Sequence, residues 1–193
     1  MSLSPKHNCC LRLVHWLLLA WLTAMPLVVL AADFKISNQV CRSADNAFVL
    51  DADIDFDFSD KVIEALQNGV PITLEMHLQV RRKGAWVWEK DLLDSRIRYQ
   101  IRYHALASVY QVVDLQNNAQ QSFVSREVAI SSLGDVHGLP VILHSKLDKG
   151  KIYNIELRAT LDIDSLPLPL RPLAYLSPDW NLSSKWHSCQ IRR

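Results

Sequence analysis

Four aspartates have the spacing that most suggests chemistry. They occupy every second position of a segment whose other residues are hydrophobic, and they are Asp51, Asp53, Asp55 and Asp57. This alternation predicts a half-buried strand with an acidic outer face. A calcium loop of the EF-hand type needs a glycine at its sixth position and a tight wrap around the ion, whereas a strand sets its carboxylates in a line. We therefore expect a solvated acidic face rather than a metal site.

A second row of charges is basic. Arg96, Arg98 and Arg102 share one face of the segment 96–103, and hydrophobic residues occupy the other face. If this strand neighbours the acidic strand, opposite charges face each other across the ladder, and each pair contributes about 0.2 to 1 kcal/mol. This pairing requires both strands to belong to one sheet.

The remaining polar residues form no recognisable catalytic motif. The histidines after position 32 are scattered, with neither a zincin motif nor a Cys/His cluster at ligand spacing, although His137 and His144 flank a Gly-Leu-Pro turn and could meet. The sequence contains no glycine-rich phosphate loop and no nucleophile elbow. We therefore assign no catalytic, cofactor or metal residues. An enzyme whose site is assembled from distant strands stays open as an alternative.

A basic turn beside a tryptophan is the best candidate for an exposed contact surface. Arg81, Arg82 and Lys83 lead into Trp86 at the tip of a predicted hairpin, and Trp88 shares the face of Trp86. Three bases and a tryptophan would also suit an anionic membrane surface. For the tryptophans themselves, burial in the core is the favoured interpretation, because large aromatic side chains are mostly buried.

Two cysteines of the predicted domain, Cys41 and Cys189, lie near its two ends. In an oxidising compartment such a pair predicts one disulfide that ties the ends together, with two unpaired thiols as the alternative. In the loop-entropy model a bridge over so long a loop contributes about 4 to 5 kcal/mol.

The amino-terminal segment predicts export. Lys6 and Arg12 precede an apolar run at 13–32 that ends in small residues, and this order is typical of a secretory signal peptide. A run of twenty residues is also long enough for an uncleaved inner-membrane anchor, which would give membrane contact through 13–32. Residues 33–193 then form one extracytoplasmic domain in the bacterial periplasm. It carries nineteen basic and twenty acidic residues, a balance that gives no general attraction to nucleic acid.

The hydrophobic pattern after position 32 is mainly that of strands. We expect strands near 48–58, 72–81, 86–88, 96–103, 109–115 and 152–163, and a final strand pair within 173–186. Ser59 and Ser125 are each expected to cap a short helix. The proline-rich segment 166–172 should lie along a sheet edge or cross between sheets. Seven or eight strands, two short helices and no regular alternation of the two predict an antiparallel β-sandwich, immunoglobulin-like or related.

Several blocks of sequence together resemble a known family. The blocks are 64–71 (EALQNGVP), 103–106 (YHAL), 161–162 (LD), 166–172 (LPLPLRP) and 179–186 (DWNLSSKW). They are similar to an uncharacterised domain-of-unknown-function family of exported proteobacterial proteins. The resemblance implies a secreted or membrane-associated protein, often encoded near a nitrogen-regulation-type sensor kinase, and it carries no catalytic residues over to this chain.

Export, a sandwich pattern and the lack of a catalytic motif favour a non-enzymatic binding or accessory module that acts on an envelope or inner-membrane protein, such as a sensor kinase. Two alternatives remain open. One is an envelope hydrolase or transferase, and the other is a structural protein tethered to the membrane by an uncut apolar run.

Overall fold

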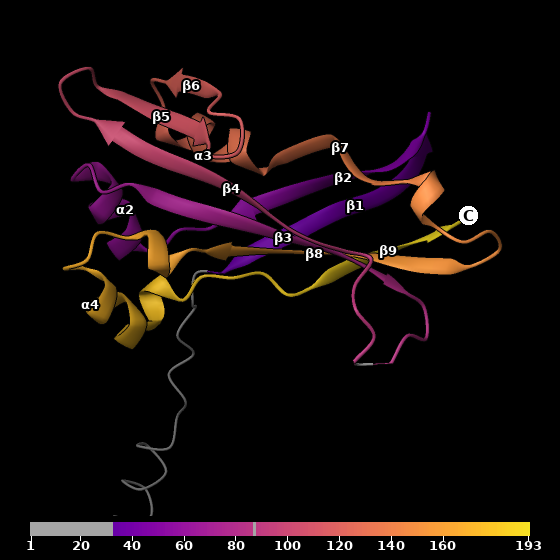
Figure 1. The fold of residues 1–193 in the computed structure, drawn as a ribbon. Helices are drawn as coiled ribbons and strands as arrows, with labels where there is room; N and C mark the ends of the chain where they lie inside the picture. The colour runs from indigo at the N-terminus through magenta and orange to yellow at the C-terminus, as the bar shows by residue number, and fades with distance from the viewer. Residues whose placement is uncertain (1–32, 87) are drawn as a thin grey trace, which may run out of the picture. The chain divides into compact units, whose positions relative to one another are not determined.

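The computed structural model describes residues 33–86 and 88–193, and the predicted signal or anchor at 1–32 lies outside them (Figure 1). The described part contains nine strands in two antiparallel sheets. The smaller sheet has the order β1-β2-β7, with β1 at Phe34–Ala44, β2 at Ala47–Phe56 and β7 at Asp135–Leu143. The larger has the order β6-β5-β4-β3-β8-β9, and its strands are β3 (Ile72–Arg82), β4 (Leu93–His104), β5 (Val109–Asp114), β6 (Gln120–Phe123), β8 (Ile152–Leu161) and β9 (His187–Arg192).

Both sheets bury one face in a single continuous core. In β2 the hydrophobic residues Ile54 and Phe56 are buried, and the aspartates between hydrophobic positions point outward. In β8 buried and half-buried residues alternate along the whole strand. The predicted antiparallel, sandwich-like fold is therefore confirmed. Its three-plus-six strand order differs from the four-plus-three order of immunoglobulin constant domains.

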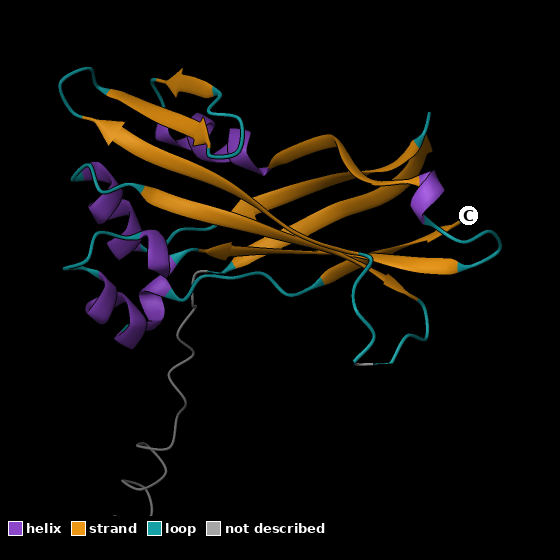
Figure 2. Cartoon of the chain, viewed as in Figure 1, coloured by secondary structure: helices purple, strands orange, loops and turns teal. Residues whose placement is uncertain are grey.

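Within the described residues three α-helices accompany the sheets: α2 at Asp60–Gln67, α3 at Arg126–Gly134 and α4 at Arg171–Leu176 (Figure 2). Both predicted caps are confirmed, because the Ser59 hydroxyl accepts a hydrogen bond from the Val62 amide and Ser125 accepts one from Val128. Short 3₁₀ turns η1 (His144–Lys146), η2 (Ile163–Ser165) and η3 (Pro178–Trp180) complete the elements.

The expected strand pair within 173–186 and the expected strand at 86–88 are wrong. Residues 173–176 belong to α4, where Pro172 is accommodated in the first turn because it needs no amide partner there, and 178–180 form η3. The described residues between 83 and 92 form no strand, and β3 pairs instead with β4, which begins at Leu93. The strands β1, β6 and β7 were not predicted, and β9 begins just beyond the last expected pair.

The disulfide between Cys41 and Cys189 is present, as the sequence predicts, with a Cα–Cα distance of 5.9 Å. It joins β1 and β9, which are the edge strands of the two sheets. The side chain of Gln39 donates a hydrogen bond of 3.3 Å to the carbonyl of Ile155 at the same edge. We refer to this as the closed edge of the sandwich.

Candidate functional site

The opposite edge lies between β7 and the β5-β6 hairpin, and α3 is inserted there (Figure 1). We call it the open edge. α3 passes directly into β7 at Gly134 and Asp135. A β-carbon on Gly134 would overlap the carbonyl oxygen of Ile54 in β2, so this close approach requires glycine. Two hollows lie on either side of this junction, and Asp135 lines both of them.

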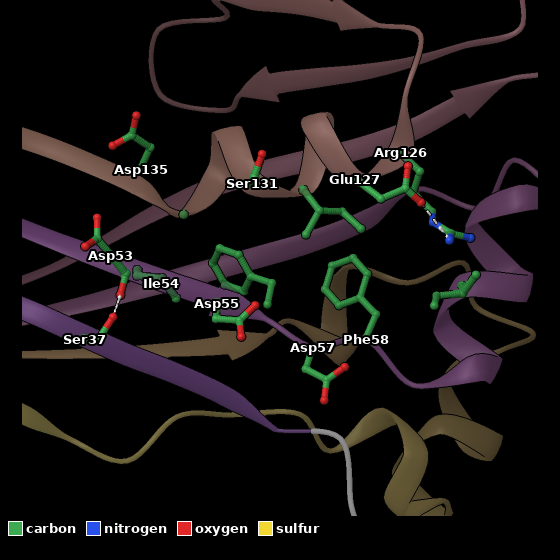
Figure 3. Close-up of a pocket in the computed structure, with 14 residues that line it drawn as sticks. Ser37, Asp53, Ile54, Asp55, Asp57, Phe58, Arg126, Glu127, Ser131 and Asp135 are labelled. Carbon is green, nitrogen blue, oxygen red and sulfur yellow. Dashed lines mark hydrogen bonds and ion pairs between the residues drawn. The ribbon is translucent and has the colours of Figure 1, made fainter.

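The first hollow is an acidic groove of about 470 Å³ between β2 and α3 (Figure 3). Its base is hydrophobic and includes Phe56, Phe58 and Ile130. Its rim carries five carboxylates and a single guanidinium, from Asp53, Asp55, Asp57, Glu127, Asp135 and Arg126. The aspartate row predicted from the sequence thus becomes one wall of the groove, because α3 lies beside it and supplies the other wall.

The carboxylates of the groove differ in whether they have hydrogen-bonding or ion-pair partners. Asp53 accepts a hydrogen bond of 2.7 Å from the Asn38 amide, and Glu127 lies 2.9 Å from Arg126. A hydrogen bond from the Ser125 hydroxyl lowers the pKa of Glu127. Asp55 and Asp57 have neither a hydrogen-bonding nor an ion-pair partner for their carboxylates within 33–86 and 88–193. These two exposed charges are therefore available to a ligand.

Asp51, the first aspartate of the row, has a different surrounding. Its carboxylate lies 2.5 Å from Arg42 Nε in β1 and accepts a hydrogen bond of 2.6 Å from the Gly138 amide in β7. The Arg42 hydrogen bond, with help from Gly138, lowers the pKa of Asp51 from 3.8 to about 2. Asp51 therefore links three strands, while the rest of the row faces the groove.

Three side chains at the end of the groove have the geometry of an incomplete metal site. Ligand atoms of Asp53, Asp135 and His137 lie within 4.8 Å of one another, and His137 Nε2 is 2.7 Å from an Asp135 oxygen. Two carboxylates and an imidazole suit a divalent ion, with water in the remaining positions. This grouping could not be predicted from the sequence, because its members come from β2 and β7 and meet only through strand pairing.

The second hollow is an interior cleft of about 390 Å³ that opens between the two sheets. Apolar side chains line part of it, with Ile97 and Val112 from the larger sheet and Leu133 and Leu139 from α3 and β7, and polar groups such as Gln121 line the rest. Tyr99 also lines it, and burial raises the pKa of its hydroxyl, with a smaller effect from Asp114. A concave, apolar cleft with a few polar groups is the usual form of a ligand or side-chain pocket.

A family model for a domain of unknown function, DUF4390, matches residues 31–190. The chain belongs to this family. No curated protein and no solved structure matches the chain. The match agrees with the family type expected from the sequence blocks, and it assigns no activity to the DUF4390 domain. Across 33–86 and 88–193, no helix is sufficiently long and apolar to span a membrane.

The predicted contact surface of this DUF4390 domain lies in the loop 83–92 and the end of β3, far from both hollows (Figure 1). Arg81 is paired with Asp91, and Arg82 with Glu89 at 2.9 Å, so much of the expected positive charge is neutralised. Lys83 lies beyond these pairs, with its Nζ 3.5 Å from the Gln190 side chain.

Burial of the tryptophans was predicted, and it holds only for some of them. Trp180 is buried, whereas Trp86 and Trp88 are 68% and 79% exposed and stack on each other with ring centroids 5.1 Å apart. Neither sequence pattern nor composition separates these cases, because burial depends on which element crosses over the ring.

The expected pairing of the acidic and basic rows is wrong. β2 and β4 belong to different sheets, so the rows do not face each other. Arg96 and Arg98 instead bind the buried carboxylate of Glu75 on β3, each at 2.9 Å. His137 and His144 do not meet either, because they lie at opposite ends of β7 and His144 is 3.2 Å from the Ser43 hydroxyl.

Proposed function

We propose that the chain is an exported, non-enzymatic binding module that holds a basic, amphipathic segment of another envelope protein at its open edge. The observation that carries this proposal is the excess of carboxylates around the acidic groove, five against one guanidinium. Asp55 and Asp57 in particular are exposed and lack partners among the described residues. A lysine or arginine of a partner would therefore gain ion pairs there without displacing an existing one.

The negative charge of the groove favours a basic protein segment over a small anion or nucleic acid. A concave surface of one charge raises the local concentration of an oppositely charged ligand and speeds its association. Phosphate-bearing ligands would be repelled by the same carboxylates. The hydrophobic base, formed by Phe56, Phe58 and Ile130, can contact the aliphatic stems of lysine or arginine side chains.

The interior cleft adds a second element of recognition. It shares Asp135 with the acidic groove, and apolar side chains from both sheets form part of its wall. Binding energy in protein interfaces is concentrated in a few anchors that fill such pockets. A partner segment that places basic residues in the acidic groove and one large apolar residue in the interior cleft would use both hollows. A periplasmic segment of a sensor kinase is one partner class that the family resemblance implies.

Affinity capture of the tagged full chain from envelope extracts, with chemical cross-linking, tests this function. The variant D55N/D57N removes two groove charges, and the control D45N/D148N removes two charges from turns at the other end of the domain. We expect one stoichiometric partner to be captured by the wild type and the control and lost with D55N/D57N. High salt should weaken the same complex.

Equal capture by all three chains would overturn the groove as the binding site. Capture of nothing specific by the wild type would count against a binding module. Turnover of an envelope substrate that disappears in H137A would instead support the alternative hydrolase or transferase, because His137 belongs to the only group of three metal-ligating side chains in the described part of the chain.

A further inference from the structure

The segment 167–176 exposes four large hydrophobic side chains, although Ala174 within it is buried. Leu168, Leu173, Tyr175 and Leu176 are 73%, 67%, 60% and 86% exposed. We call these four residues the α4 face. Leu173 and Leu176 are three positions apart on the helix and therefore lie on the same side of it. An exposed apolar surface of this kind marks an interaction site more often than chance exposure.

The segment 167–176 carries only one charged side chain, so its exposed surface is mainly apolar. Arg171 is its only charged residue, and the Arg171 side chain turns back to donate a hydrogen bond of 2.7 Å to the Leu166 carbonyl. The Tyr175 hydroxyl is hydrogen-bonded to Asp164, which leaves the ring on the surface. Tyrosine rings with one polar end are typical of membrane interfaces.

The first described residue lies near this face. Asp33 lines a hollow of about 620 Å³ together with Pro178 and Trp186. Pro178 follows the end of α4 by two residues. If the run 13–32 is an uncut anchor, as the alternative from the sequence has it, its covalent link to Asp33 would hold the domain close to a bilayer.

The loop 83–92 projects on the same side of the domain as α4 and also exposes apolar rings. Figure 1 shows α4 and the loop 83–92 both pointing to the bottom of the view, while α3 and β6 lie at the top. The loop presents the stacked and exposed rings of Trp86 and Trp88. Lys83 and Lys90 are also in this loop, and neither takes part in an ion pair within the described residues. Tryptophan with lysine suits the headgroup region of an anionic bilayer.

We infer that the chain docks on a lipid bilayer at two points, the α4 face and the tryptophan loop, which is the loop 83–92. This orientation turns α3, the acidic groove and the interior cleft away from the bilayer, so they stay accessible to a partner. The inference is independent of the proposed function of the open edge.

Hydroxyl-radical footprinting of the full chain tests the docking. The chain is synthesised cell-free onto vesicles of phosphatidylethanolamine and phosphatidylglycerol, so that residues 1–32 are retained. Val124 and Val128 provide an internal reference, because they are 84% and 52% exposed near α3. After normalisation to exposed area, we expect the α4 face and Trp86/Trp88 to be oxidised about fivefold more slowly than the reference, as interfacial burial requires.

Two variants identify what covers the α4 face. L173S/L176S should raise the oxidation of both the α4 face and Trp86/Trp88, because both sites contact the same bilayer. The matched variant V124S/V128S should change the oxidation of neither site. Equal oxidation of all exposed sites in the wild type would overturn the docking. Protection of the α4 face alone would indicate another segment of the chain folded over it, and protection that disappears at a higher lipid-to-protein ratio would indicate a second copy. Either result would also overturn it.

Discussion

At one edge of the sandwich a covalent bond joins the two sheets, and at the other a helix stands between them. The closed edge brings β1 and β9 together through Cys41 and Cys189. At the open edge, α3 lies between β7 and the β5-β6 hairpin. This edge contains both the acidic groove and the interior cleft. We infer that the closed edge stabilises the fold, whereas the open edge supplies the proposed binding surface.

Removal of the disulfide should have the largest effect on stability. The bridge spans a sequence separation of 148 residues, and a loop of that length corresponds to about 4 to 5 kcal/mol in the loop-entropy model. We expect C41S/C189S to lose free energy of unfolding of that order, measured by denaturant titration, with partner capture at the open edge retained at low temperature. A loss below about 1 kcal/mol would show that packing alone holds the closed edge.

Substitution of Gly134 by alanine should damage the open edge. The new β-carbon would overlap the Ile54 carbonyl oxygen, so α3 must move away from β2, and such overpacking costs about 1 to 3 kcal/mol. Because Gly134 lines the acidic groove and precedes Asp135, which lines both hollows, G134A should weaken partner capture as well as stability. S131A, one turn earlier on the exposed side of α3, is the control and should remain within about 0.5 kcal/mol of the wild type. Equal stability of G134A and S131A would contradict this close approach.

The sequence predicted the parts of both edges but not their assembly. The disulfide followed from two cysteines near the ends of a domain, and the acidic strand and the Ser125 cap followed from local pattern. The strand β1 was missed because a register shift between Ser37 and Val40 breaks its alternation, and Asn38 there has a φ of 50°. In β7, Gly138 and Pro140 are typical of a turn, yet register shifts in its pairing with β2 accommodate both.

The groove itself could not be predicted in the same way. Its two walls are more than sixty residues apart in the sequence, and only the packing of α3 against β2 brings Asp55 and Glu127 to one hollow. The α4 face was misread for a related reason. Residues 173–176 were expected to form a strand, and only the position of α4 at the surface shows that Leu173, Tyr175 and Leu176 are exposed.

The pH dependence of stability should separate Asp51 from the other aspartates. Because the folded-state pKa of Asp51 is lowered to about 2, the carboxylate stabilises the fold above its ordinary pKa of 3.8, and this contribution is lost as the pH falls toward 2. We expect wild type to exceed D51N in free energy of unfolding at neutral pH, and the difference to shrink between about pH 4 and pH 2. A difference that is constant over this range would argue against the pairing with Arg42 and Gly138.

Neutralisation of the groove should have the smallest effect on stability and a large effect on binding. Asp55 and Asp57 are exposed, and D55N/D57N also relieves the mutual repulsion of the groove carboxylates, so the change in free energy of unfolding should lie within about 0.5 kcal/mol of zero. Thermal unfolding of D55N/D57N beside D45N/D148N measures this directly. If D55N/D57N instead unfolds several degrees lower than the control, these carboxylates support the fold and the open edge is not a surface reserved for a partner.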